Sequence, residues 1–130
     1  MHKSLIVLVP LLLAACTPES APQGQQLFNA YCVQCHGVSA QGDGVLAEDL
    51  DQPPADLTAL ALANDGVMPR DHVMQLVHGY PGKFQTTTMP EFGPLLRGPT
   101  RQIRTQDGML VETPIALIAL VDYLETLQQR

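Results

Sequence analysis

A Cys-x-x-Cys-His run, Cys32-Val33-Gln34-Cys35-His36, is the feature that most constrains what this chain can fold into. Two thiols spaced i to i+3 on one helical turn match the distance between the two vinyl groups of a porphyrin, and the adjacent imidazole then falls under the iron. The run therefore predicts covalent attachment of one haem c. In this interpretation Cys32 and Cys35 form the thioether bonds and His36 is the proximal iron ligand.

Two other uses of a Cys-x-x-Cys pair have weaker support. A zinc site needs a second pair of ligands, and no cysteine follows Cys35 in the chain. A thioredoxin-like dithiol needs a βαβ pattern around the motif, and the flanking sequence has none. Haem attachment is the interpretation that the sequence favours.

Composition agrees with a small domain built around a cofactor. The chain has 130 residues, of which 45 % are hydrophobic but only 5 % aromatic, with no Trp. A buried porphyrin would supply apolar surface that so few aromatic side chains cannot. The net charge is −6 and no basic tract runs through the chain, which argues against a nucleic-acid partner. The sequence has no pairing of a nucleophile with a base, and no paired carboxylates, that would indicate an enzyme.

The N-terminus resembles an export signal. Lys3 gives a positive start, residues 5–13 are apolar, and Leu13-Ala14-Ala15-Cys16 follows. The apolar run is too short to span a membrane as a helix. Ordinary cleavage near Ala15 is one outcome. The other follows from the likeness of Leu-Ala-Ala-Cys to the bacterial lipobox, in which the cysteine becomes the lipid-modified first residue.

We therefore expect three parts: a lipoprotein signal peptide over 1–15, a lipid-anchored flexible tether over 16–23, and the globular domain over 24–130. The stretch after Cys16 is rich in Pro, Ser, Gly and Gln, which is typical of a tether. The domain would face the periplasm. Thr17 is not one of the acidic residues associated with inner-membrane retention, so the outer membrane is weakly favoured.

Periodicity and turn residues predict a mostly helical domain with long loops. A helix over 24–34 leads into the motif. A Thr113 N-cap with Pro114 predicts a last helix over 114–128, which buries Leu117, Ile118, Val121, Tyr123 and Leu124. Other expected elements are short turns at 45–50 and 57–63, a helix over 70–78, an extended loop over 80–90 and a small β-hairpin at about 101–112 with a tight Asp-Gly turn.

The second axial position decides what a haem at this site can do. Met89-Pro90 lies in the extended loop, where the backbone is free to direct a sulfur at iron, so Met89 is the expected ligand. Pro69 is better explained as the start of a helix, which makes Met68 the lesser candidate. Met74 is expected in the core and Met109 in hairpin packing. His72 and His78 are the imidazole alternatives.

These residues resemble those of the class I cytochromes c, small monohaem electron carriers. The resemblance spans residues 24 to about 128 and rests on Cys32 to Gly37, on Met89-Pro90-Glu91-Phe92 and on Val121-Asp122-Tyr123-Leu124. It implies an all-α fold of three main helices around one covalent haem, with Gly24, Phe28 and Tyr123 where the first and last helices cross. It also implies that a carbonyl of Pro53 or Pro54 accepts the Nδ1–H of His36.

Two departures from the family stand out. The stretch 93–113 is an insertion before the last helix, and Lys83 is the only lysine after the signal region, so the haem edge has no ring of lysines. Arg97, Arg101 and Arg104, with Lys83, are either a solvated surface or a docking patch for an acidic partner.

The expected function is non-enzymatic electron transfer between exported or membrane-bound redox partners, with His/Met ligation of the iron. The first alternative is the haem c subunit of a larger oxidoreductase complex. A less favoured one is a ligand-binding or peroxidatic haem protein with an open sixth site.

Overall fold

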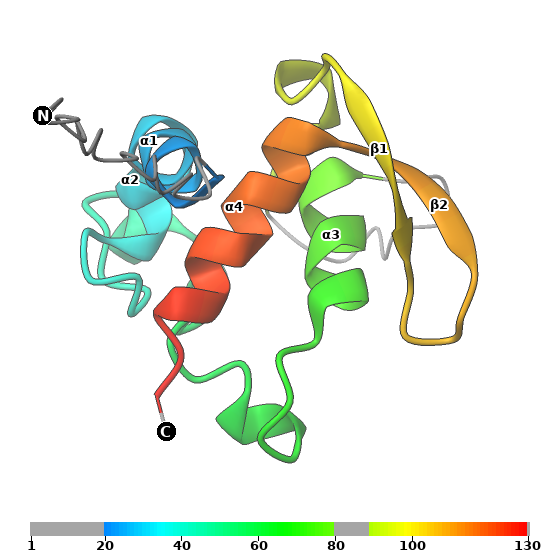
Figure 1. Cartoon of the computed structure of the whole chain (residues 1–130). Coiled ribbons are helices and arrows are strands. Elements are labelled where there is room, and N and C mark those ends of the chain that lie inside the picture. Colours follow the sequence, from blue (N-terminus) through cyan, green and yellow to red (C-terminus); the bar gives the residue numbers. More distant parts are fainter. Residues whose placement is uncertain (1–19, 80–88, 130) are drawn as a thin grey trace, which may run out of the picture.

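The structure is a computed structural model that describes residues 20–79 and 89–129. In this part of the chain, helices surround a core and one two-stranded antiparallel sheet projects beside them (Figure 1). The helices are α1 (Ser20–Tyr31), α2 (Val33–His36), α3 (Arg70–His78) and α4 (Ile115–Thr126); the 3-10 turns are η1 (Ala47–Asp49), η2 (Leu62–Asn64) and η3 (Gly93–Leu95); the strands are β1 (Thr100–Arg104) and β2 (Leu110–Pro114).

The mostly helical fold with a hairpin is confirmed, and the element boundaries differ from expectation in places. α1 begins at Ser20, so residues 20–23, expected in the flexible tether, are helical. It ends at Tyr31, and the motif forms the separate short helix α2, which makes four α-helices in the described residues where three main ones were expected. α3 coincides with the expected 70–78 helix and ends at Gly79, which has a φ of 78°. Most of the expected 80–90 loop lies outside the described residues.

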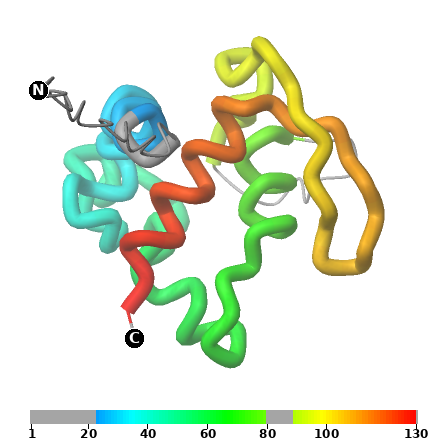
Figure 2. The backbone as a smooth tube through the Cα atoms, viewed as in Figure 1, coloured from blue at the N-terminus to red at the C-terminus, as the bar shows by residue number. Residues whose placement is uncertain are grey.

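α1 and α4 cross in close contact at Gly24. A Cβ on Gly24 would lie 2.1 Å from the carbonyl oxygen of Ala119 and 2.7 Å from the Cβ of Tyr123, so only glycine permits this approach. One turn later Phe28 is fully buried, with its ring centroid 5.6 Å from that of Tyr123. The small and aromatic residues expected at the crossing are therefore found there. Figure 2 shows the first helix lying against the last one.

α4 is the central element of the core. Leu117 and Val121 are fully buried, and Ile118 and Leu124 are nearly so, as the apolar pattern of this helix predicted. Leu120, which was not predicted, is also buried. α1 covers one part of its surface and α3 another. Because apolar side chains cover so much of its surface, α4 packs against both α1 and α3.

The start of α4 differs from the prediction. Thr113 is not an N-cap: it belongs to β2, is buried, and donates its hydroxyl to the carbonyl of Val111 at 3.3 Å. Pairing with Arg101 across the hairpin holds Thr113 in extended backbone. α4 therefore begins at Ile115, directly after the strand and without a side-chain cap.

The hairpin pairs Arg104 with Leu110 and Ile103 with Val111 around a turn at residues 105–108. The N–H of Gly108, whose φ is 88°, donates to the carbonyl of Thr105 at 2.9 Å. Ile103 packs against the core. Met109, which was expected in hairpin packing, is 59 % exposed.

No helix within residues 20–79 and 89–129 is long and apolar enough to cross a membrane.

Gly24→Ala should lower the unfolding free energy by about 1–3 kcal/mol, because the added methyl group overpacks the α1–α4 contact. Helix propensity alone would favour alanine by roughly 1 kcal/mol, so the packing term must exceed that gain. Denaturant unfolding of the haem-loaded chain measures the difference. Gln25→Ala, at the exposed neighbouring position, is the control. Equal stability of Gly24→Ala and the parent chain would contradict the prediction.

Candidate functional site

The two cysteines and the histidine of the motif lie on one turn of backbone that continues from α1. The N–H of Cys32 donates to Phe28 at the end of α1, and the N–H groups of Cys35 and His36 donate to the carbonyl of Cys32 at 3.2 and 2.9 Å. Residues three apart on a helical turn share a face, so the two sulfurs are placed on the same side. Neither cysteine is in a disulfide, and both are half-buried.

A loop over residues 37–46, the motif loop, folds back and satisfies the carbonyl groups of the motif. The N–H groups of Gly42, Gly44 and Leu46 donate to the carbonyls of His36, Cys35 and Gln34 at 2.9, 3.1 and 2.8 Å. A Cβ on Gly44 would lie 2.3 Å from the Gln34 oxygen, so this approach requires glycine. Local spacing in the sequence gives no sign of this pairing between the motif loop and the motif.

The imidazole of His36 is oriented by one backbone carbonyl. Its Nδ1 lies 3.0 Å from the oxygen of Ala55. The expectation that Pro53 or Pro54 supplies this carbonyl is therefore wrong, because the acceptor is Ala55, one or two residues later. The Pro54 oxygen faces the motif loop instead, 2.3 Å from where a Cβ on Gly42 would lie.

The protonation of His36 suits a metal ligand. Burial lowers its pKa, while the hydrogen bond to Ala55 acts in the opposite direction. The neutral ring is thus favoured at pH 7. Donation of the Nδ1–H to Ala55 leaves the Nε2 lone pair available to a metal.

The surroundings of Cys32 disfavour the charged form of its free thiol. Burial, and then the neighbouring Cys35, raise the pKa of this thiol to about 11. A zinc site would need further protein ligands beside the motif. In the described residues there is also no group of three or more His, Cys, Asp or Glu that could hold a metal ion. These observations fit a porphyrin held by thioethers better than a protein-bound zinc ion.

The methionines divide by burial. Met74 is 5 % exposed in the core, as expected, and Met68 is equally buried there. Met89 is partly buried and packs against the same core cluster. His72 is exposed and His78 is partly so.

The residues that follow Met89 are held close to the motif. The N–H of Phe92 donates to Val77 at the end of α3 at 2.8 Å. The Phe92 ring lies 6.3 Å from that of Tyr31, which immediately precedes Cys32. The chain after Met89 thus returns beside the start of the motif, a juxtaposition that the sequence alone did not provide.

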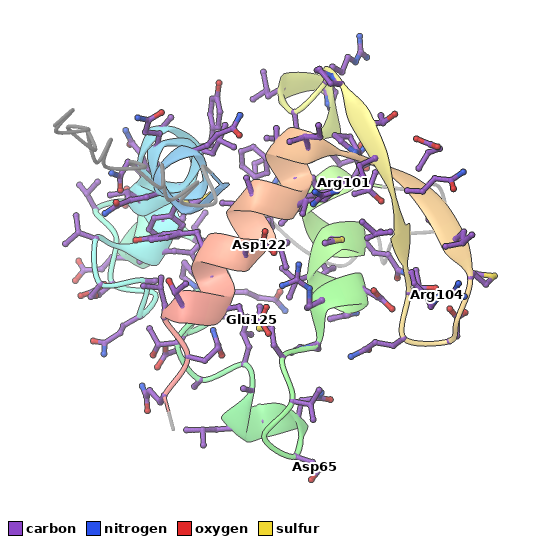
Figure 3. All side chains as sticks on the ribbon, in the orientation of Figure 1. Asp65, Arg101, Arg104, Asp122 and Glu125 are labelled. Carbon is purple, nitrogen blue, oxygen red and sulfur yellow. The ribbon has the colours of Figure 1, made fainter. Side chains whose placement is uncertain are left out.

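A cluster of charged groups fixes the segment after Met68. Arg70 forms ion pairs with Asp122, at 2.5 Å, and with Glu125. Burial opposes the charge of Arg70, but its two carboxylate partners outweigh this and raise its pKa. Figure 3 shows Asp122 and Glu125 on α4, on the side that faces α3. The start of α3 is thereby tied to α4.

The remaining candidates lie on the surface or outside the described residues. Arg97, Arg101 and Arg104 are exposed, and Arg104 donates to the carbonyl of Gly108 at 2.7 Å. Cys16 and Lys83 fall outside the described residues.

Comparison with known protein families gives a match. A family model described as "Cytochrome C oxidase, cbb3-type, subunit III" matches residues 19–103. The matched region contains the motif and Met89 and ends inside β1. Neither the curated proteins nor the solved structures gave a match.

Gly44→Ala should lower the unfolding free energy by about 1–3 kcal/mol, because a methyl group there would collide with the Gln34 carbonyl and open the motif loop. Val45→Ser, at an adjacent side chain that is 80 % exposed, should change it by no more than about 0.5 kcal/mol. Denaturant unfolding of both variants in the haem-loaded form checks the prediction. Equal losses in the two variants would refute a specific role for Gly44.

Proposed function

Because the chain belongs to the family of cbb3-type cytochrome c oxidase subunit III, and so carries one covalently bound haem c, we propose that it is a one-electron carrier with His/Met-ligated iron. The observation that carries the proposal is the constrained motif: two half-buried cysteines on one turn, followed by a histidine whose Nδ1 is bound to a backbone carbonyl. When bound, the haem iron supplies a centre that accepts and returns a single electron without breaking a substrate bond.

We assign a separate task to each motif side chain. Cys32 and Cys35 hold the porphyrin edge by thioether bonds. His36 ligates through Nε2, and its Nδ1–H bond to Ala55 fixes the plane of the ring. The three motif-loop amides keep the backbone of this turn in place, so that electron transfer requires little rearrangement of the ligand.

Met89 is the proposed sixth ligand. It is partly buried against the core, and Phe92, three residues later, contacts the residue before Cys32. Met68 lies in the core and precedes α3, whose start is fixed to α4 by Arg70. A thioether in this position saturates the iron and favours the ferrous state, which suits an electron carrier and no catalytic role.

Met89→Ala should abolish the methionine–iron charge-transfer band of the ferric protein, because it removes the sulfur ligand. Met68→Ala is the matched control and should keep the band while losing stability as a core truncation. Optical spectra of the two purified variants test the assignment.

Survival of the band in Met89→Ala with its loss in Met68→Ala would reverse the assignment. A five-coordinate spectrum in the unmodified protein, with rapid carbon monoxide binding by its ferrous form, would support the open-site alternative instead.

The description of the family favours a second candidate function, that of a haem c subunit within an oxidoreductase complex. Both candidates use the same residues for electron transfer and differ in the partner. Purification under mild detergent distinguishes them: a subunit co-purifies with other redox chains in fixed proportion, whereas a free carrier purifies alone. Exposed Arg97, Arg101 and Arg104 are the candidate contact for an acidic redox partner.

We further propose that residues 1–15 are removed as a signal peptide and that Cys16 carries the lipid anchor on the periplasmic side, with the outer membrane favoured. The support is the Leu-Ala-Ala-Cys sequence itself. Acyl chains on one residue would hold the domain firmly at a bilayer surface.

Cys16→Ser should move the protein from the membrane fraction to the soluble periplasmic fraction and abolish labelling by radioactive palmitate. Thr17→Ser, which keeps the cysteine, should change neither property. Membrane association of Cys16→Ser equal to that of the parent chain would show that another feature anchors the protein.

A further inference from the structure

The carbonyl that orients His36 belongs to a segment with little regular structure of its own. Residues 55–61, here the acceptor segment, contain no α-helix or strand. No helix or strand hydrogen-bond ladder within this segment fixes the position of the Ala55 oxygen. Its position depends on bonds from elsewhere in the fold.

On the motif side, the acceptor segment has one such bond. The N–H of Leu57 donates to the carbonyl of Ala40 in the motif loop at 2.8 Å. Within the segment, Thr58 donates its backbone N–H and its hydroxyl to Asp56 Oδ1 at 2.8 and 2.6 Å, which holds the pKa of that carboxyl below its usual value.

On the other side, the segment is held by the two glutamines that follow α4. Gln128 accepts the N–H of Ala61 at 2.9 Å and donates to the carbonyls of Leu57 and Leu124 at 2.7 and 2.8 Å. A side-chain amide is suited to this role, because its oxygen accepts one hydrogen bond while its NH₂ group donates two. Ala61 and Leu57 lie 67 and 71 residues before Gln128 in the sequence. Leu124 lies near the end of α4, four residues before Gln128.

Gln129 adds two bonds to the same segment. Its backbone N–H donates to the Thr58 carbonyl at 2.8 Å, and its side-chain amide donates to the Thr58 hydroxyl at 2.7 Å. The hydroxyl in turn donates a hydrogen bond to Asp56, two residues before it. Figure 2 shows the red end of the chain near the segment that connects α2 to α3.

From these contacts we infer that Gln128, Gln129 and Thr58 form a C-terminal clamp, a set of positioning residues that fixes the Ala55 carbonyl and, through it, the imidazole of His36. The inference rests on the proposed function, since it concerns the proximal ligand. α4 is the most deeply packed helix, so the clamp relates the orientation of the ligand to the rigid core.

The clamp has a consequence for the reduction potential. A firmly held Nδ1–H···O bond makes His36 a more basic ligand, and a more basic ligand favours ferric iron. Loosening the clamp weakens this bond and should therefore raise the potential.

Gln128→Leu removes the three side-chain bonds without changing the charge. In the haem-loaded full chain, it should increase the ferrous-to-ferric ratio at a fixed ambient potential about threefold, which is roughly 30 mV at 59 mV per tenfold. Spectroelectrochemistry measures the shift, and the NMR shifts of the haem methyl groups in the ferric protein report the ring orientation. Gln75→Leu, at an exposed glutamine of α3, should leave both unchanged.

A purely structural clamp gives a different result: Gln128→Leu would lower the unfolding free energy and leave the potential and methyl shifts at their parent values. That outcome overturns the inference. If Gln128→Leu fails to fold with haem, Thr58→Val, which removes only the hydroxyl between Gln129 and Asp56, decides by the same two measurements. Absence of covalent haem from the parent chain would contradict the proposed function instead, so the two failures are distinguishable.

Discussion

The contact between α1 and α4 at Gly24 is the constraint on which the rest of the structure depends. It brings a helix backbone within reach of the Ala119 carbonyl, a distance at which no side chain fits. Both helices lead directly into parts of the site. Cys32 continues the backbone hydrogen bonding of α1, and Gln128 begins the C-terminal clamp just beyond α4. One packing contact therefore fixes two segments that are far apart in the sequence.

His36 lies where these two segments meet. Its backbone is positioned through α1 and the motif loop, and its Nδ1 partner is positioned by the clamp from α4. The pKa of His36 reflects the same environment, because burial lowers it and the Ala55 bond partly offsets that effect. A side chain held from both ends has little freedom to reorient when its charge environment changes. For the proposed iron ligand, this restraint keeps the structural cost of electron transfer low.

The sequence predicted features that depend on local spacing and missed those that depend on distant contacts. The spacing of the Cys-x-x-Cys-His run and the apolar pattern over residues 70–78 are both local features. The helix predicted from the second of them, α3, has the expected bounds. Thr113 was predicted as an N-cap but lies in β2, because pairing with Arg101 across the hairpin overrides the preference of threonine for helix N-caps. The predicted acceptor for His36 was Pro53 or Pro54, whereas the acceptor in the structure is Ala55. The role of Gln128 could not be predicted, because its partner Leu57 lies 71 residues away in the sequence.

The hairpin before the last helix is compatible with the geometry of the candidate site. The family match ends inside β1, yet α4 beyond it still forms the crossing with α1. β2 leads into α4 without a loop, so the strand pairing itself fixes where the helix starts. Ile103 packs on the core, and Asp71 at the start of α3 accepts the N–H of Gln106 in the turn at 2.6 Å. The hairpin is thus held to the core through Ile103 and to α3 through its turn.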